Sequence, residues 1–374
     1  MLQDDMQYMQ RALDLAAKGQ YTTAPNPNVG CVLVRDGQIV GEGWHQRAGE
    51  PHAEVHALRA AGDAARGATA YVTLEPCSHY GRTPPCALAL IEAGVRRVVV
   101  AMQDPNPLVA GRGLTLLREA GIDVVCGIGE AEAEALNPGF IKRMRHGLPW
   151  VRVKQAATLD GRTALADGRS QWITGPEARA DVQRWRARSS VILAGADTVL
   201  ADNPALNVRW QALPEAVQAE YALASVRQPV RVIVDSRNRV DATAHLFTCP
   251  GPIWMARATP KPDWPAGQEE LLLPTVPSGK LDLRALLQAL AARGVNEVWV
   301  EGGRQLSAAL LAVGLVDEWF LYLAPKVLGE SAQGLLALPA PDTLPAGAQF
   351  AWQDMTRIGV DLRLILRPLA ALEE

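Results

Sequence analysis

The feature that most constrains the fold is an alternation of short β-branched runs with helical segments along most of the chain. The runs TAYVTL at 69–74 and VRRVVVAM at 95–102 flank CALALIEAG at 86–94, which has a helical apolar pattern and ends at a glycine. Strands separated by helices in this way predict layered α/β domains. The alternation pauses at RHGLP, residues 145–149, and then restarts.

The length of the chain predicts two such domains. Its 374 residues exceed the size of roughly 250–300 residues at which a single hydrophobic core stops growing. The pause at 145–149 contains a glycine and a proline, which suit a joint. We therefore expect one domain over residues 1–147 and a second over residues 148–374.

Local patterns predict the individual elements. In the first half we expect a hairpin over 29–44 that turns at Asp36-Gly37, a strand at 122–127, and helices over 5–18, 53–62 and 111–120. In the second half we expect helices over 176–188, 281–293 and 304–313, and strands over 150–157, 190–194, 230–235, 253–257, 297–301, 317–323 and 360–366. Residues 210–229 are poorly patterned and predict a loop with a short helix.

The stretch EPCSHYGRTPPC, residues 75–86, indicates metal chemistry. Cys77 and Cys86 each follow a proline, and PHAE places His52 and Glu54 at the start of a preceding helix. Imidazole and thiolate are ligands that zinc prefers, and three of them leave one tetrahedral position open for water. Zinc lowers the pKa of that water to about 7, and Glu54 could carry its proton to a leaving amine. We predict one Zn²⁺ per chain on His52, Cys77 and Cys86, with Glu54 as the catalytic residue.

A structural zinc site remains an alternative at this point. His52 and His56 lie four residues apart, so both could face one side of a helix. Together with Cys77 and Cys86 they would make a set of four zinc ligands, which leaves no position open for water. Glu54 would then have no role, which favours the three-ligand interpretation.

The arrangement His-x-Glu, Pro-Cys, then a second Cys resembles the zinc-dependent cytidine-deaminase-like superfamily. The common form of that motif has two residues between the cysteines, whereas this chain has eight, SHYGRTPP. The longer insert resembles one branch, the RibD family of bifunctional riboflavin-biosynthesis deaminase–reductases. Further stretches similar to that family are APNPNVGCVLV at 24–34, DPNPLVAGRG at 104–113, VKQAATLDGRTA at 153–164, SQWITG at 170–175, TVLADNPALNVR at 198–209 and EGG at 301–303.

The resemblance implies an N-terminal cytidine-deaminase-like α/β/α layer and a C-terminal dihydrofolate-reductase-like, mostly parallel sheet with flanking helices. It implies hydrolytic deamination of 2,5-diamino-6-ribosylamino-4(3H)-pyrimidinone 5′-phosphate by the first domain. The second domain would then reduce 5-amino-6-(5-phosphoribosylamino)uracil at the ribosyl C1′ with NADPH, giving the ribitylamino product.

The resemblance also implies the residues of the reductase site. The second half contains no G-x-G-x-x-G fingerprint, and its pair Gly302-Gly303 alone is a weak signal for a pyrophosphate site. For the cofactor the resemblance implies Ala156, Trp172, Thr198, Asp202, Ser236, Gly303, Arg304, Gln305, Leu306 and Ser307. For the substrate it implies Ser170, Arg186, Leu206, Arg209, Glu301 and Lys154.

Roles for some of these residues follow from their chemistry. Ser236, with Arg237 and Arg239 nearby, could hold a 2′-phosphate and favour NADPH over NADH. Arg186 and Arg209 could clamp the 5′-phosphate of the substrate, although surface ion pairing is the alternative for both. Glu301 would hydrogen-bond ribose hydroxyls and Lys154 would lie near the reacting sugar carbon.

Other histidines and cysteines have ordinary interpretations. His45 and His79 lie on loops near the proposed zinc site, where they either contact the pyrimidine or its phosphate or serve as polar loop residues. Cys31, Cys126 and Cys249 are interpreted as ordinary small residues. An odd total of five cysteines does not indicate a disulfide framework.

Charge and sequence pattern argue against nucleic-acid and membrane partners. The net charge is −3 and no long run of Lys or Arg is present, which disfavours nucleic acid. No apolar run reaches the roughly 18 residues of a membrane helix, and the N-terminus lacks the pattern of a signal peptide. We expect a cytoplasmic homo-oligomer, with a dimer favoured. A nucleic-acid-editing zinc deaminase with an accessory domain and a non-catalytic metal module are the competing functions.

Overall fold

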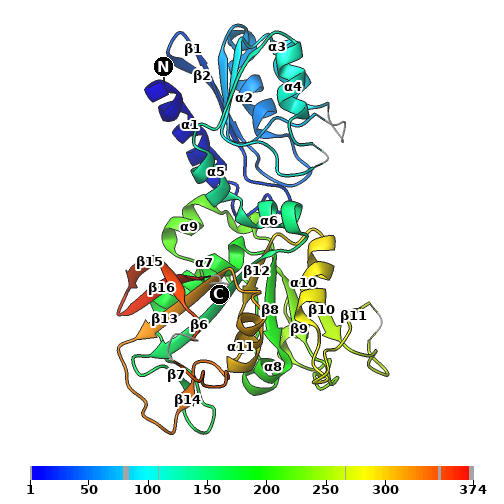
Figure 1. Cartoon of the computed structure of the whole chain (residues 1–374), viewed down its shortest axis with the longest axis vertical. Coiled ribbons are helices and arrows are strands. Elements are labelled where there is room, and N and C mark those ends of the chain that lie inside the picture. Colours follow the sequence, from blue (N-terminus) through cyan, green and yellow to red (C-terminus); the bar gives the residue numbers. More distant parts are fainter. Residues whose placement is uncertain (1, 79–83, 108, 266, 344–346, 370–374) are drawn as a thin grey trace. The chain divides into compact units, whose positions relative to one another are not determined.

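A computed structural model describes residues 2–78, 84–107, 109–265, 267–343 and 347–369 (Figure 1). The chain divides into two compact units, Met1–Leu148 and Pro149–Glu374. Each unit contains its own main sheet, of five and nine strands respectively. Within the described residues, every helix is too short or too polar to span a bilayer.

The sheet of the first unit contains β1 (Gly30–Arg35), β2 (Gln38–Trp44), β3 (Thr69–Val72), β4 (Arg97–Val100) and β5 (Asp123–Cys126). Its strand order is β2-β1-β3-β4-β5, with β1 antiparallel to both neighbours and β3, β4 and β5 parallel. The predicted hairpin is confirmed: Asp36 and Gly37 both have positive φ angles, 51° and 75°, as a type I′ turn requires.

Helices cover both faces of this sheet. They are α1 (Leu2–Ala17), α2 (Ala53–Ala61), α3 (Cys86–Ala93), α4 (Arg112–Glu119), α5 (Glu130–Leu136) and α6 (Pro138–His146), with a 3₁₀ turn at Gly62–Ala65. Ala57 of α2 and Leu90 of α3 pack with Leu33 in one core cluster. Met9 of α1 packs with Val32 in the other, so alternate residues of β1 face opposite layers.

Two glycines let helices lie directly on strand backbone. A methyl group on Gly30 would lie 1.9 Å from the carbonyl oxygen of Ala12 in α1. A methyl group on Gly43 would lie 2.5 Å from the carbonyl oxygen of Ala53 in α2. The first turn of α2, which follows His52, is therefore fixed against β2.

The main sheet of the second unit has the strand order β11-β10-β9-β8-β12-β6-β13-β16-β15. All neighbours from β11 to β13 are parallel, and β16 and β15 add antiparallel pairs at one edge. The strands are β6 (Trp150–Thr158), β8 (Val191–Gly195), β9 (Val230–Val234), β10 (Ile253–Arg257), β11 (Glu269–Leu272), β12 (Glu297–Val300), β13 (Glu318–Ala324), β15 (Phe350–Ile358) and β16 (Asp361–Pro368). A separate pair joins β7 (Arg162–Ala164) to β14 (Gln333–Gly334).

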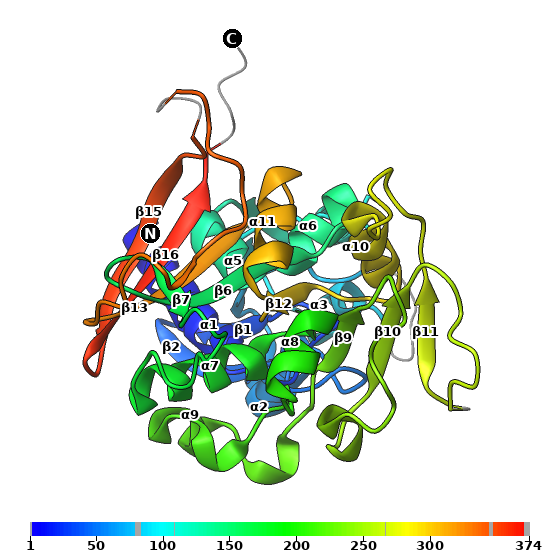
Figure 2. The same ribbon diagram turned by 90° about the horizontal axis from the view of Figure 1, so that it is seen from below.

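The helices of the second unit lie on both faces of its sheet. They are α7 (Pro176–Arg188), α8 (Ala196–Asp202), α9 (Glu215–Glu220), α10 (Leu283–Ala292) and α11 (Arg304–Ala312), with 3₁₀ turns at Trp210–Ala212, Leu223–Ser225 and His245–Thr248. Figure 2 shows α10 and α11 on one side of the strands and α7 and α8 on the other. The aromatic rings of Trp185, Trp299 and Phe320 form the centre of the core under α7.

The helices and strands predicted from the sequence are present, but the structure also contains elements that the sequence did not predict. The loop with a short helix predicted over 210–229 is confirmed, and it contains α9. The elements that were not predicted are β7, β11, β14, β15, α5, α6 and α8. The sequence of β15 mixes polar residues with exposed Trp352 and Met355, so it has no clean apolar alternation.

Candidate zinc centre and reductase site

The three predicted metal ligands converge in the first unit. His52 is the N-cap of α2, Cys86 is the first residue of α3, and Cys77 lies on the loop after β3. Nδ1 of His52 lies 3.6 Å from Sγ of Cys77 and 3.4 Å from Sγ of Cys86, and all three ligand atoms lie within 4.8 Å of one another. Ligands about 2.0–2.3 Å from a tetrahedral zinc ion lie roughly 3.3–3.8 Å apart. This donor set therefore fits zinc with one open position.

The two cysteines form a polarised pair. The backbone N–H of Cys86 donates to Sγ of Cys77 at 3.2 Å. Hydrogen bonds from the Cys86 thiol, and then from His52 and this N–H, hold the pKa of the Cys77 thiol well below its ordinary value. The hydrogen bond to Cys77 and burial raise the pKa of the Cys86 thiol. The pair thus offers a ready thiolate at position 77, and metal binding would release the remaining proton.

Glu54 is buried beside this cluster. Only 3% of the residue is exposed, although it lies in the first turn of α2. Burial, reinforced by the charge of Cys77, raises the pKa of its carboxyl group to about 7. A carboxyl group with that pKa can both accept and return a proton at neutral pH.

His45 contacts the cluster from a neighbouring loop. Its Nδ1 lies 3.1 Å from the carbonyl oxygen of Pro51, so Nδ1 carries the proton, and its Nε2 accepts from Nδ2 of Asn26 at 3.0 Å. Burial lowers the pKa of the ring, which keeps it neutral. The ring packs edge-on against His52, with the centroids 5.4 Å apart. His45 therefore supports the orientation of the His52 ring.

Two further histidines were considered near this centre, His56 and His79. His56 does not belong to the cluster of ligand atoms within the described part of the chain, and its Nε2 is buried without a hydrogen-bond partner there. The geometry therefore gives no support to a four-ligand site. His79 lies outside the described residues, so the prediction for it stays open.

Sequence analysis missed a buried carboxylate next to the centre. Glu75 is 3% exposed and accepts hydrogen bonds from four backbone N–H groups. The available signal was a single acidic residue between an apolar strand and the Pro-Cys pair. That signal does not reveal the partners, because they lie 29 to 39 residues further along the chain.

In the second unit, the residues predicted for the cofactor, other than Trp172, lie at or just after the carboxyl ends of neighbouring strands. Four adjacent strands of the sheet are parallel, namely β9, β8, β12 and β6, so their carboxyl ends lie side by side at one end of the strands. We call this row of carboxyl ends the strand-end edge. Ser236 follows β9, Thr198 and Asp202 lie in α8 after β8, and Ala156 lies near the end of β6. A methyl group on Gly303, which follows β12, would lie 3.8 Å from Oγ1 of Thr198. The fold thus brings α8 and the Gly303 turn together.

Gly303 is the N-cap of α11, and Arg304, Gln305 and Leu306 begin that helix on an accessible surface. A helix N-terminus with a glycine turn suits the phosphates of a dinucleotide. Ser307, the fifth residue of the predicted turn, differs because it is 1% exposed. Its side chain therefore faces the core rather than this surface.

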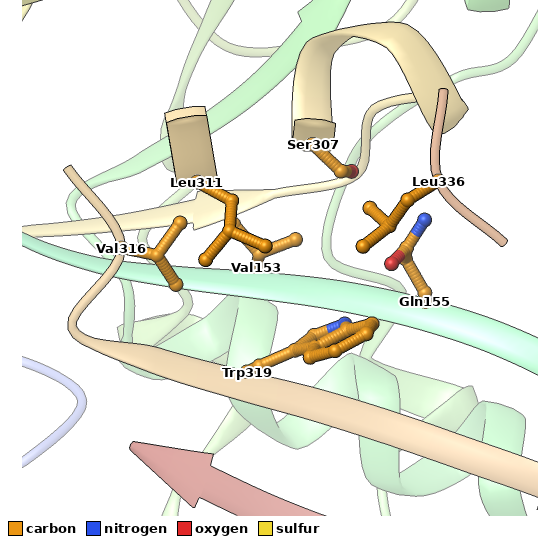
Figure 3. Close-up of a pocket in the computed structure, with 7 residues that line it drawn as sticks. All are labelled: Val153, Gln155, Ser307, Leu311, Val316, Trp319 and Leu336. Carbon is orange, nitrogen blue, oxygen red and sulfur yellow. The ribbon is translucent and has the colours of Figure 1, made fainter. Parts of the chain in front are cut away.

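Figure 3 shows Ser307 in a small cavity of the second unit, between α11, β6 and β13. Oγ of Ser307, Oε1 of Gln155 and Nε1 of Trp319 find no hydrogen-bond partner among the described residues. The cavity has room for roughly one water molecule. The cavity lining is Val153, Gln155, Ser307, Leu311, Val316, Trp319 and Leu336.

Three residues predicted for the substrate form one charged cluster. Nε and Nη2 of Arg186 donate to the two carboxylate oxygens of Glu301 at 2.5 and 2.8 Å. The register of β6 with β12, which pairs Val153 with Val300, places Lys154 beside Glu301. Burial alone would raise the pKa of Glu301, but the charge and hydrogen bonds of Arg186 outweigh it and hold that pKa at about 2. Burial lowers the pKa of Lys154, although Glu301 opposes the shift.

The comparisons with known proteins cover both units. One family model, the cytidine and deoxycytidylate deaminase zinc-binding region, matches residues 2–102, and another, the RibD C-terminal domain, matches residues 149–362. The chain is 56% identical to the riboflavin biosynthesis protein RibD of Escherichia coli (strain K12), over 97% of this chain and 99% of that protein.

The chain belongs to the RibD family.

Solved structures with the same fold agree with that membership. The first form of RibD from Acinetobacter baumannii superposes with a TM-score of 0.90 and is 45% identical, over 99% of this chain and 100% of that one. A diaminohydroxyphosphoribosylaminopyrimidine deaminase/5-amino-6-(5-phosphoribosylamino)uracil reductase from Thermotoga maritima gives a TM-score of 0.86 at 33% identity, over 98% and 99% of the two chains. The predicted fold class and family are confirmed.

This RibD-family chain is a bifunctional deaminase and reductase of riboflavin biosynthesis, and the nucleic-acid-editing alternative is not favoured. Its cofactors are Zn²⁺ and NADPH. The His52, Cys77 and Cys86 donors fit the first, as their spacing shows. The accessible Gly303 turn at the strand-end edge fits the second.

The other predicted reductase residues lie outside the charged cluster of this RibD-family site. Arg209 is exposed, and its guanidinium forms no ion pair with the described residues. Leu206 is 3% exposed and belongs to the core. Ser170 and Trp172 lie on the loop before α7, and the Trp172 ring stacks with Arg179 at 4.6 Å from its guanidinium carbon.

Proposed function

We propose that the domain over residues 1–147 deaminates the diaminopyrimidinone ribosyl 5′-phosphate and that the domain over residues 148–374 reduces the resulting ribosylaminouracil phosphate. The observation that carries this proposal is the cluster of His52, Cys77 and Cys86 with buried Glu54 beside it. The product of the first domain is the substrate of the second, so one chain would perform consecutive steps.

In the deaminase domain, His52, Cys77 and Cys86 hold the metal. Zinc at this position supplies activation of a water molecule by lowering its pKa to about 7. Glu54 would accept a proton from the water molecule as the water oxygen bonds to C2, and would deliver a proton to the amine nitrogen as the bond from that nitrogen to C2 breaks. The pKa of about 7 for Glu54 suits both transfers. Ammonia leaves and the ring keeps a carbonyl oxygen at C2.

In the reductase domain, NADPH would supply a hydride to C1′ of the ribose, while the bond from C1′ to the ring oxygen opens and that oxygen takes a proton. We assign Lys154 to the neighbourhood of the reacting carbon and Glu301 to the ribose hydroxyls, since the two residues are adjacent and the side chain of Glu301 is only 12% exposed. All three nitrogens of the Arg186 guanidinium already donate, two to Glu301 and Nη1 to the carbonyl oxygen of Asn207 at 2.9 Å. Arg186 therefore holds Glu301 in place, and exposed Arg209 is the group better placed to bind the 5′-phosphate.

The cofactor assignment rests on the strand-end edge. Ala156, Thr198, Asp202 and Ser236 would line NADPH there, with Trp172 covering it. The first turn of α11, from Gly303 through Arg304, Gln305 and Leu306, would hold the phosphates, and Ser170 would contact the substrate. The side chains of Ser307 and Leu206 are buried, so these two predicted residues would contribute through their backbone only. Arg237 and Ser236 would hold the 2′-phosphate, whereas Arg239 is already paired with Asp197 at 2.6 Å.

The protein is further proposed to act as a cytoplasmic homodimer. Support for dimerisation comes from edge strand β15, where Trp352 and Met355 are 67% and 69% exposed. Light scattering on the wild type and on Met355→Asp tests this. A dimer that the substitution dissociates is expected, and a wild-type monomer would refute it.

The function is tested by incubating the purified protein with the diaminopyrimidinone substrate, with and without NADPH, and by following products by mass spectrometry. Without NADPH, the expected product has exchanged one NH for O; with NADPH it also gains two hydrogens. His56→Ala should keep its zinc, whereas His52→Ala should lose it. Equal zinc loss in both variants would refute the proposed ligand set.

A further inference from the structure

Glu75 joins the loop that carries Cys77 to a distant part of the deaminase unit. Its Oε2 accepts from the backbone N–H groups of Asp104 at 3.1 Å and Gly111 at 2.9 Å. Its Oε1 accepts from Gly113 at 2.8 Å and Leu114 at 3.4 Å. Each carboxylate oxygen of Glu75 therefore accepts two N–H hydrogen bonds, and only 3% of the residue is exposed.

These contacts make Glu75 a remote cap for α4. The N-cap of that helix is Gly111, which has no side chain to satisfy the first N–H groups. Gly113 and Leu114 occupy the second and third helical positions, which an N-cap side chain ordinarily serves. Glu75 supplies that acceptor from another part of the chain, and its negative charge at a helix N-terminus is favourable.

Backbone contacts fix the same segment from two more directions. The N–H of Glu75 donates to the carbonyl oxygen of Met102 at 3.0 Å. A methyl group on Gly113 would lie only 2.1 Å from the carbonyl oxygen of Pro76. The carbonyl oxygen of Cys77 accepts from the N–H of Ala87 in α3 at 3.2 Å. The segment from Glu75 to Cys77 is thus held between α4 and α3.

We propose that Glu75 is a positioning residue for the zinc centre, which acts by fixing the Cys77 thiolate relative to His52 and Cys86. This inference rests on the ligand set of the proposed function. Metal–ligand distances tolerate deviations of only about 0.2 Å, and groups that orient ligands typically change metal affinity 10–100-fold when they are removed. Glu75 does not touch the metal site itself, so its effect reaches zinc through the Pro76–Cys77 backbone.

The test is Glu75→Gln, which keeps the shape of the side chain but turns one acceptor oxygen into a donor amide. That amide would oppose two N–H groups, either those of Asp104 and Gly111 or those of Gly113 and Leu114. Zinc transfer to a chelator should become at least about tenfold faster, and the visible spectrum of the Co²⁺-substituted protein should change. Glu75→Asp, which keeps both acceptor oxygens on a shorter side chain, should recover part of the loss.

Asp5→Asn is the matched control. Asp5 is another buried carboxylate of the same unit, 3% exposed, and accepts from Tyr71 and Arg97 on strands of the same sheet. Asp5→Asn should lower the melting temperature of the protein while leaving zinc transfer to the chelator at the wild-type rate. All variants are compared at a temperature where each is folded, with the NADPH-dependent reductase rate as an internal check.

The outcomes separate the two claims. Faster zinc release in Glu75→Gln than in Asp5→Asn supports the inference. Wild-type release in Glu75→Gln, or equal acceleration in both variants, overturns it while leaving the ligand set intact. Zinc retention by Cys77→Ser would instead overturn the ligand set, and the positioning role with it.

Discussion

Glu54 is the residue to which we assign proton transfer in the proposed deamination. Its position two residues after His52 puts it in the first turn of α2, and burial there raises its pKa to about 7. Sequence spacing could predict its place beside the metal, because the motif is short and lies on one helix. The raised pKa could not be predicted, since it depends on the core packed around the side chain.

Glu54→Gln should keep its zinc and its fold but lose deamination. Glutamine has nearly the same shape and cannot carry the proton, and general acid–base catalysis typically contributes 10²–10⁴-fold. The rate of ammonia release and the zinc content measure the two effects. A rate loss below about tenfold would remove Glu54 from the proton transfer.

Alanine substitutions of Arg186 and Arg209 should affect different properties, the first stability and the second substrate binding. Arg186→Ala removes the guanidinium that donates to both carboxylate oxygens of Glu301, so the free energy of unfolding of the second unit should fall by about 3–5 kcal/mol. Arg209→Ala removes an exposed side chain, so stability should change by less than about 0.5 kcal/mol while KM for the reductase substrate rises. Urea unfolding and steady-state kinetics on both variants check this. Similar stability losses in the two variants would contradict the assignment.

The pKa of Glu301 gives this pair a defined pH dependence. Its value of about 2 lies below the ordinary value of 4.5, so the ionised form is stabilised in the folded state. The contribution is complete above about pH 4.5 and is lost as the pH falls toward 2. Unfolding free energies measured between pH 5 and 3 should therefore show a steeper acid decline in the wild type than in Arg186→Ala.

At the scale of elements, helix α2, which carries His52 and Glu54 at its start, packs directly on the backbone of β2. The contact depends on Gly43, where a methyl group would lie 2.5 Å from the Ala53 carbonyl oxygen and 2.6 Å from the Ala57 nitrogen. Both neighbours are helix backbone and cannot rotate away. Any displacement of α2 also moves His52 and Glu54, which lie at its start.

Gly43→Ala should therefore destabilise the first unit by about 1–3 kcal/mol and weaken its zinc binding, as overpacked cores do. Gly37→Asn is the control, because Gly37 has open space around it and asparagine tolerates its φ of 75°. Thermal unfolding and zinc content measured on both variants test the argument. Normal zinc affinity in Gly43→Ala would show that α2 can shift without disturbing the ligands.

The same scale shows what sequence patterns can predict here. The hairpin at Asp36-Gly37 and the helix ending at Gly94 have local signals, and both are present. The seven-residue helix α8 completes too few turns to show a periodic apolar face, so it was missed. The Arg186–Glu301 pair joins residues 115 positions apart, and only the folded sheet and α7 bring them together. The family resemblance supplied those two residues, but not the contact between them.

At the scale of the whole molecule, two units with separate sheets and separate chemistry share one chain. The proposed zinc ligands, Glu54 and Glu75 all lie in Met1–Leu148, whereas the strand-end edge and the charged cluster lie in Pro149–Glu374. Each unit has its own buried core clusters. The account therefore predicts that zinc matters to the first activity and not to the second.

Cys77→Ser tests that central claim most directly. Serine stays protonated and is a poor zinc ligand, so the variant should lose zinc and deamination. Supplied with the already deaminated ribosylaminouracil phosphate, the same protein should oxidise NADPH at close to the wild-type rate. A folded Cys77→Ser protein that fails in this isolated reductase assay would contradict two independent sites.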